Sequence, residues 1–172
     1  MGLLSYISID ENNETQLACL DALWIPYMRE IYRDDPDFTD TDEQLRQGVR
    51  QRVHASAVQK DMFFELAYNK EGNCVGFLFY AVDYGGIPGI LPPGFGYIME
   101  VYTALEYRRH GYAAQMYERM RRQFLDRNVS TFYLTPDAES GMPFWKAMGF
   151  VDSGLTDPDN HMPIYYKRIN LV

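Results

Sequence analysis

The chain has few of the residues that build metal centres. Its 172 residues include only two cysteines and three histidines. Cys19 falls in a predicted helix and Cys74 in a predicted strand, where each is expected to be a small buried hydrophobe. His54, His110 and His161 are scattered and show no metal-ligand spacing. The sequence therefore predicts no metal site.

Long apolar runs and excess positive charge are also missing. No segment approaches the roughly 18 consecutive apolar residues that suggest a membrane span, and no basic region followed by an apolar run marks a secretory signal. The 16 Lys and Arg residues are outnumbered by 24 Asp and Glu residues, which gives a net charge of −8. That balance argues against nucleic acids and anionic membranes as general partners. We expect a protein of the reducing cytoplasm.

The composition is otherwise that of a folded globular protein. Hydrophobic residues make up 47% and charged residues 23% of the chain. No repeat, low-complexity tract or long linker divides it. The length suits one domain covering residues 1–172.

Hydrophobic periodicity and turn residues predict an alternation of strands and helices. Strands are expected at residues 4–9, 62–68, 75–82, 97–103, 129–135, 150–155 and 163–169. Helices are expected at residues 14–32 and 113–124. Another helix should begin after an N-cap at Thr41, with Gln44 completing a capping box. A short helix should run from Pro136 to a cap at Gly149. A strand–helix–strand unit near the middle implies a parallel pair, and the hairpins imply antiparallel neighbours. The fold class is mixed α+β, with about seven strands in a mostly antiparallel sheet and about four flanking helices.

Residues 83–95 are the least regular stretch. They contain several prolines and glycines, which oppose both helix and central strand, together with many apolar residues. We expect a lid or a pocket wall here rather than a solvated connection.

The most informative segment is residues 107–114, which joins a predicted strand directly to an amphipathic helix. The first turn of a helix leaves backbone N–H groups unpaired, and the positive end of its dipole attracts anions. Gly111 allows phosphate oxygens to approach the backbone where a Cβ would interfere. The alternative is an ordinary helix start after a surface loop.

The order Arg108-x-x-Gly111-x-Ala113 resembles the (Arg/Gln)-x-x-Gly-x-(Gly/Ala) signature of the GNAT superfamily of acyl-CoA N-acyltransferases. The element order resembles that family from residue 4 to residue 169. The resemblance implies acetyl-CoA as acyl donor, with its pyrophosphate on the amides of the loop and its pantetheine along the preceding strand. The residues expected to bind it are Val101, Tyr102, Thr103, Arg108, Arg109, His110, Gly111, Tyr112, Ala113 and Ala114.

The same resemblance implies two catalytic roles on the strand at residues 97–103. The amide of Val101 would stabilise the oxyanion of the tetrahedral intermediate. Glu100 would be the general base, because a primary amine is about 99.9% protonated at neutral pH and must lose a proton before attack. Strand alternation warns that Glu100 faces away from Val101 and Thr103. A solvated or hydrogen-bonded structural carboxylate is the alternative.

The position that holds the proton donor for the leaving thiolate differs from the family pattern. Phe144 to Phe150 resembles the family's Phe-Tyr-x-x-x-Gly-Phe segment, in which the tyrosine often protonates the thiolate. Here Trp145 takes that position, and an indole N–H is no useful acid. Ala138 takes the place of a family asparagine. The alternatives for protonating the thiolate are Ser140, Tyr133, water, or no donor at all.

An acidic segment after the first helix is the expected acceptor pocket. Tyr27, Tyr32, Asp34 and Asp35 would attract and pack against a cationic amine, with the loop of residues 83–95 as the opposite wall. The amine would belong to a small molecule or to a protein. A solvated acidic surface is the alternative.

Together these features predict an N-acetyltransferase that transfers the acetyl group directly, without a covalent cysteine intermediate. The alternative is a GNAT-fold module that binds acyl-CoA as a sensor or regulatory subunit. Mononucleotide and dinucleotide motifs are missing, which weakens a third interpretation as a nucleotide-binding protein. A homodimer would form through the terminal strands or the apolar loop.

Overall fold

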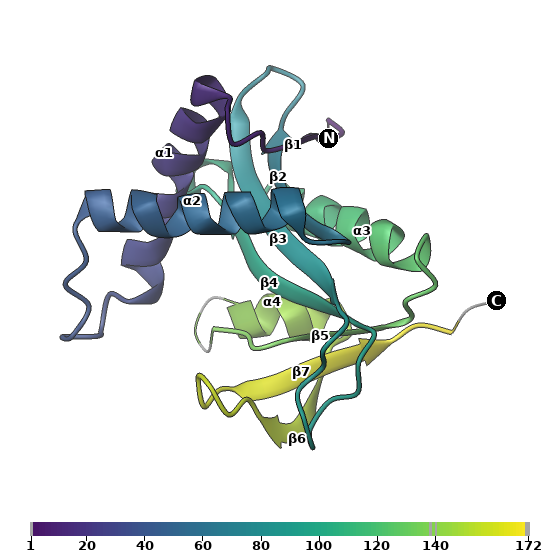
Figure 1. The fold of residues 1–172 in the computed structure, drawn as a ribbon. Helices are drawn as coiled ribbons and strands as arrows, with labels where there is room; N and C mark the ends of the chain where they lie inside the picture. Colours follow the sequence, from purple (N-terminus) through teal and green to yellow (C-terminus); the bar gives the residue numbers. More distant parts are fainter. Residues whose placement is uncertain (1, 138, 140, 171–172) are drawn as a thin grey trace. The chain divides into compact units, whose positions relative to one another are not determined.

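We describe the protein from a computed structural model, which covers residues 2–137, 139 and 141–170. The elements are β1 (Ser5–Ser8), α1 (Glu14–Ile31), α2 (Asp42–Val58), β2 (Met62–Tyr68), β3 (Cys74–Asp83), β4 (Phe95–Thr103), a 3₁₀ helix (Leu105–Tyr107), α3 (Tyr112–Leu125), β5 (Thr131–Leu134), α4 (Gly141–Ala147), β6 (Val151–Thr156) and β7 (Pro163–Arg168). Figure 1 labels them along the chain. In the described ranges, none of the helices combines the length and the apolar character needed to cross a bilayer.

The strands form one sheet in the order β1-β2-β3-β4-β5-β7-β6. Its pairs are antiparallel except for β4 with β5, where Gly96 is in register with Phe132 and Tyr97 with Tyr133. This confirms the predicted mixed α+β fold with a single parallel pair. The crossover between the two parallel strands contains α3, as a parallel connection requires.

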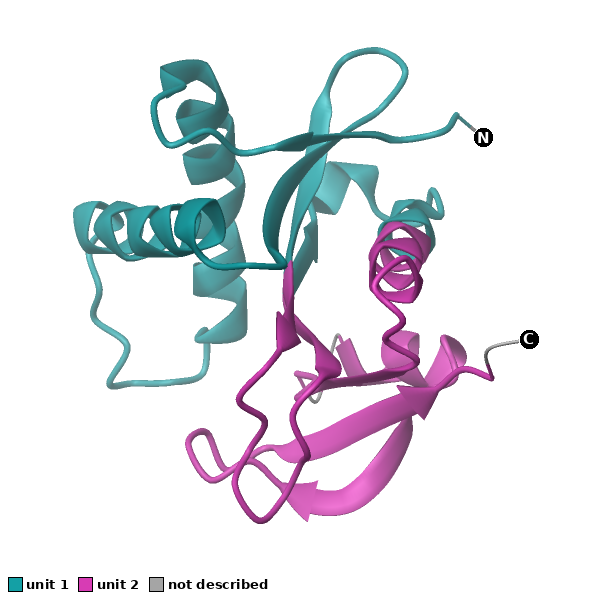
Figure 2. Ribbon diagram, turned by 45° about the vertical axis from the view of Figure 1, so that its right-hand side comes forward, with its two compact units in different colours: residues 1–79, 100–116 teal, residues 80–99, 117–172 magenta. Residues whose placement is uncertain are grey.

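The chain divides into two compact units that share β3, β4 and α3 (Figure 2). Unit 1 contains residues 1–79 and 100–116. Its helices α1 and α2 pack on each other, and α2 packs on β2. Five aromatic rings pack together in its core, and the centroids of neighbouring rings are 5.3–6.4 Å apart. The five come from α1, β2, β3 and β4 and are Trp24, Tyr27, Phe64, Phe77 and Tyr102.

Unit 2 contains residues 80–99 and 117–172. Phe124 of α3 packs at 4.9 Å on Phe132 and at 5.5 Å on Tyr80, measured between ring centroids. It fits because β4 has a glycine beneath it: a Cβ at Gly96 would lie 2.9 Å from the ring atoms of Phe124. Tyr97 stacks on Tyr133 at 4.5 Å.

Local sequence signals explain most element boundaries. Thr41 and Gln44 form the predicted capping box at the start of α2. Gly149 has φ +87°, which confirms the predicted left-handed cap after α4. The prediction for the start of α4 was wrong, because the helix begins at Gly141 and not at Pro136; the backbone carbonyl of Asp137 instead accepts from Met142 N–H at 2.9 Å.

Two further expectations need correction. The 3₁₀ helix at Leu105–Tyr107 was not predicted, since one turn leaves no periodic pattern. Cys19 and Cys74 lie in the expected helix and strand, but both are half-buried rather than fully buried. The partial burial of Cys74 is still enough to raise the pKa of its thiol to about 12.

Candidate functional site

The loop that leads into α3 adopts a backbone suited to present amides. Arg109 has φ +64° and Gly111 has φ +74°, both in the left-handed region that favours glycine. The N–H of Gln115 donates to Gly111 O at 3.3 Å, so the amides from Gly111 to Ala114 precede the first hydrogen-bonded turn. Alternating left-handed residues and a helix N-terminus are a combination that binds anions through the backbone.

The side chain of Arg108 is used to hold this loop. Its guanidinium forms a bidentate pair with Glu30 of α1 at 3.0 and 2.7 Å. Its Nε donates to the carbonyl oxygen of Thr103 at 3.0 Å, and its carbon Cζ lies 5.4 Å from the ring centre of Tyr102. Glu30 also raises the pKa of Arg108. Arg108 therefore fixes the end of β4 to α1, and its charge is already paired.

His110 closes the loop on itself. Its Nδ1 lies 2.7 Å from the carbonyl oxygen of Arg108 and 3.1 Å from that of Tyr107, both of which can only accept. The imidazole also stacks on Tyr112 at 5.8 Å. These contacts turn two loop carbonyls toward His110, while the side chains of Arg109 and His110 remain exposed.

The end of β4 offers backbone groups on one edge. Ala104 N–H donates to Val75 O on β3 at 2.9 Å. Because successive residues of an antiparallel strand present their backbone groups to opposite edges, Val101 and Thr103 face away from β3. The register pairs of β4 with β5 stop at Tyr97, whereas β4 continues to Thr103. Val101 and Thr103 thus point their N–H and C=O groups to an edge beyond the parallel pairing.

Glu100 points to the opposite face from Val101, into the aromatic core of unit 1. The hydroxyl of Tyr27 donates to its Oε2. Burial raises the pKa of Glu100, while the hydrogen bond from Tyr27 and the charge of Arg52 on α2 oppose that rise. Burial, followed by the charge of Glu100, raises the pKa of Tyr27 well above its ordinary value, so Tyr27 stays a proton-bearing donor. Glu100 nevertheless keeps part of its surface accessible.

The four residues expected at the acceptor pocket are not brought together. Tyr27 is 8% exposed inside the core, while Tyr32 is 39% exposed and stacks on Phe38 at 4.6 Å. Asp34 and Asp35 are exposed on the loop after α1. Tyr27 contacts Glu100 and Tyr102, while the backbone N–H of Asp35 donates to the carbonyl oxygen of Tyr32 at 3.1 Å.

One of the side chains named as an alternative proton donor, Tyr133, can be placed, and so can Trp145, which takes the position of the family tyrosine. Tyr133 is buried in unit 2, and its hydroxyl donates to Asp83 Oδ2 at 2.7 Å. Burial and this bond raise the pKa of Tyr133 strongly, which makes it a poor acid. Trp145 is buried against Tyr117 and Phe150. Ser140 and Ala138 lie outside the described residues.

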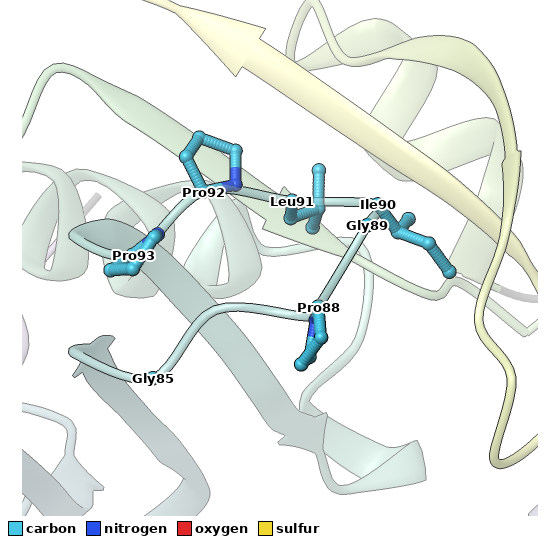
Figure 3. A pocket seen from close by; sticks show the side chains of 7 residues that line it. All are labelled: Gly85, Pro88, Gly89, Ile90, Leu91, Pro92 and Pro93. Atoms are coloured by element: carbon cyan, nitrogen blue, oxygen red, sulfur yellow. The ribbon is translucent and has the colours of Figure 1, made fainter.

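The loop of residues 83–95 surrounds a hollow of about 460 Å³ in unit 2 (Figure 3). Its lining comes from the loop itself: Gly85, Pro88, Gly89, Ile90, Leu91, Pro92 and Pro93. Asp83 ties the loop at both ends. Its Oδ1 accepts from Gly85 and Gly86 N–H at 3.1 and 2.9 Å, and its carbonyl oxygen accepts from Gly94 N–H at 2.6 Å. The described part of the chain holds no cluster of His, Cys, Asp and Glu able to bind a metal.

Sequence reasoning missed Arg52 and the pairing of Tyr27 with Glu100. Arg52 stands over the ring of Trp24 at 5.0 Å and near both of these residues. The only available signal was Tyr27 on the apolar side of α1, where a hydroxyl requires a partner. Nothing in the sequence indicated that this partner lies 73 residues away.

Comparison with known proteins places this arrangement in a family. A search of curated proteins gave no significant match. Among solved structures, the PaiA N-acetyltransferase of Thermoplasma acidophilum in complex with coenzyme A is 12% identical, with a TM-score of 0.69 over 96% of this chain and 99% of that one. An acetyltransferase of Thermus thermophilus is 15% identical, with a TM-score of 0.72 over 98% and 100% of the two chains.

A predicted acetyltransferase of Clostridium acetobutylicum, solved with acetyl-CoA, is 18% identical, with a TM-score of 0.60 over 92% and 93% of the two chains. At these identities the likeness shows the fold alone. The family model of the acetyltransferase (GNAT) family matches residues 25–150, which include the loop, β4 and Trp145. The chain therefore belongs to the GNAT acetyltransferase family.

Proposed function

We propose that the protein is an acetyl-CoA-dependent N-acetyltransferase that transfers the acetyl group directly to a primary amine. The observation that carries the proposal is the backbone between β4 and α3, where Arg109 and Gly111 turn through the left-handed region into a helix start. Such amides suit the pyrophosphate of coenzyme A, and each hydrogen bond to a charged group contributes roughly 1.5–3 kcal/mol. Membership of the GNAT family supports the same donor.

The remaining groups have roles along β4. The backbone groups of Val101 and the N–H of Thr103, whose carbonyl oxygen already accepts from Arg108 Nε, would pair with the pantetheine amides, as an added strand does. The N–H of Val101 would stabilise the oxyanion. Glu100, with a raised pKa, would take the proton of the ammonium group, directly or through water, before the neutral amine attacks the thioester carbon. The tetrahedral intermediate then expels the thiolate of coenzyme A, and the extra proton of the attacking nitrogen is lost to solvent, from which the thiolate can be protonated.

One observation favours a second function, a module that binds acyl-CoA without efficient turnover. Trp145 stands where the family pattern has a tyrosine, and the hydroxyl of Tyr133 is committed to Asp83. Neither side chain is a ready donor for the leaving thiolate. Such a protein would bind acetyl-CoA as tightly as an enzyme and release no free thiol.

Calorimetric titration with acetyl-CoA, coenzyme A and ATP tests the donor site. We expect both coenzyme A species to bind and ATP not to compete. Gly111→Trp, which fills the turn at φ +74°, should abolish binding, whereas Gly89→Trp in the loop of residues 83–95, also at a glycine of positive φ, should not. Unchanged affinity in Gly111→Trp would contradict the assignment.

Thiol release on a panel of amines then separates the two functions. The panel contains spermidine, tryptamine, lysine and a peptide with a free N-terminus, so that it covers both small-molecule and protein amines. Turnover with any of them, lost in Glu100→Gln, supports the enzyme. Tight acetyl-CoA binding without turnover on the panel supports the sensor.

A further inference from the structure

Glu100 is held at one oxygen only. In the residues that the structure describes, Tyr27 gives Glu100 its single hydrogen bond, and the bond goes to Oε2. Oε1 has no partner there. A carboxylate held in this way keeps one oxygen to accept a proton while the other fixes its orientation.

The side chain of Tyr27 is itself held in place by the rings around it. Its ring lies 5.4 Å from that of Trp24, 5.3 Å from that of Phe77 and 5.4 Å from that of Tyr102, measured between centroids. These neighbours come from α1, β3 and β4, and all are buried. The hydroxyl of Tyr27 therefore cannot swing away from Glu100 without repacking the core of unit 1.

We infer that Tyr27 is a positioning residue for Glu100, which orients the carboxylate and keeps its anionic form available as the base of the proposed acetyl transfer. The role of this contact in catalysis rests on the proposed function. The contact between Tyr27 and Glu100 does not depend on that function. A hydroxyl donor favours the ionised carboxylate, since a protonated carboxyl accepts less strongly. Burial acts in the opposite direction and is the larger influence on the pKa of Glu100.

The other charged group near this pair lies on α2. Arg52 favours the ionised forms of both Glu100 and Tyr27 through its charge, and its guanidinium donates to Gly48 O at 3.3 Å. Tyr32, at the C-terminal end of α1, raises the pKa of Tyr27. Glu100 therefore faces one hydrogen-bond donor on α1 and one cation on α2.

The test is an NMR titration of the protein labelled with ¹³C at the glutamate carboxyl carbons. The Glu100 signal is assigned by its loss in Glu100→Gln. In Tyr27→Phe, which keeps the ring, we expect Glu100 to titrate about one pH unit higher than in the wild type. Tyr68→Phe is the matched control, because it removes a tyrosine hydroxyl of the same unit that lies near Cys19 and Cys74 and not near Glu100. An unchanged titration in Tyr27→Phe, or an equal shift in Tyr68→Phe, overturns the inference.

A second variant tests the same contact in the opposite direction and without loss of packing. Site-specific 2,3-difluorotyrosine at position 27 is a stronger donor, so Glu100 should titrate lower than in the wild type. Absence of any downward shift overturns the inference even if Tyr27→Phe fails to fold.

The kinetic arm uses the panel amine with the fastest turnover. The acidic limb of its pH–rate profile should move upward in Tyr27→Phe together with the NMR titration. If the acidic limb stays fixed while the pKa of the Glu100 carboxyl shifts, Tyr27 does not position the base of the reaction. Because the titration needs neither acetyl-CoA nor an amine, failure of the proposed function would leave the contact between Tyr27 and Glu100 standing on its own evidence.

Discussion

Gly76 of β3 is the position where the smallest substitution should do the most damage in unit 1. An ideal Cβ there would lie 2.1 Å from the carbonyl oxygen of Tyr102 and 2.9 Å from the terminal methyl of Met116. Carbon and carbonyl oxygen approach comfortably at about 3.3 Å, so β3 and β4 would have to separate by about 1 Å. The methyl of Met116 can move aside, but the backbone of β4 cannot.

The cost of Gly76→Ala follows from this geometry. Overpacking costs typically 1–3 kcal/mol, and stretching a neighbouring strand bond such as Ala104 N to Val75 O, now 2.9 Å, adds about 1 kcal/mol. We expect the free energy of unfolding to fall by about 3 kcal/mol. Gly48→Ala is the control: it lies inside α2 with nothing within 4 Å of the new Cβ, and it should stabilise by about 0.5–1 kcal/mol.

Urea unfolding, followed by tryptophan fluorescence and far-UV circular dichroism, measures both variants. The midpoint should fall for Gly76→Ala and rise for Gly48→Ala at unchanged m-value. A loss below about 1 kcal/mol in Gly76→Ala would refute the reasoning, because it would mean that β3 and β4 part more easily than packed strands do.

Three more predictions concern the candidate site. Thr103→Val removes a buried hydroxyl without a hydrogen-bond partner among the described residues and should raise the free energy of unfolding by about 1 kcal/mol. A lower free energy of unfolding in urea would show that the hydroxyl has a hydrogen-bond partner. His110→Ala releases the loop carbonyls and should weaken acetyl-CoA binding about tenfold by calorimetry, and an unchanged Kd would show that the loop holds without it. Glu100→Gln should be more stable than the wild type at neutral pH, because the raised pKa means that the folded protein binds the proton more tightly than the unfolded chain. The wild type then loses stability as pH rises from 4.5 through the raised value, so the difference should vanish in acid; equal thermal stability at all pH values would contradict it.

The fold was predictable because its signals are local. The capping box at Thr41 and the cap at Gly149 each depend on residues within four positions of one another. The start of α4 was misplaced because Pro136 is compatible with a first helical turn, and sequence alone does not show that the turn fails to form there.

The candidate site was predictable only where its chemistry is backbone chemistry. The loop at Arg109 and Gly111 follows from glycine position and helix periodicity. The side chains of the site form contacts between residues far apart in the sequence. Arg108 pairs with Glu30, 78 residues earlier, and the hydroxyl of Tyr27 donates to Glu100. Such pairs are set by the packing of α1 on the sheet, which no local pattern specifies.

Asp83 gives the loop that follows β3 the character of an exchangeable cassette. One residue accepts from Gly85, Gly86 and Gly94, so both ends of the loop close on the same point of β3. Between these anchors, Leu91 packs on Tyr133 of β5 and Ile164 of β7, and Ile87 and Ile90 pack against the same cluster. Libraries that vary the exposed Pro88, Pro92 and Pro93 while keeping Asp83, the three glycines and Leu91 should fold at near wild-type frequency, which makes this hollow a practical place to engineer recognition.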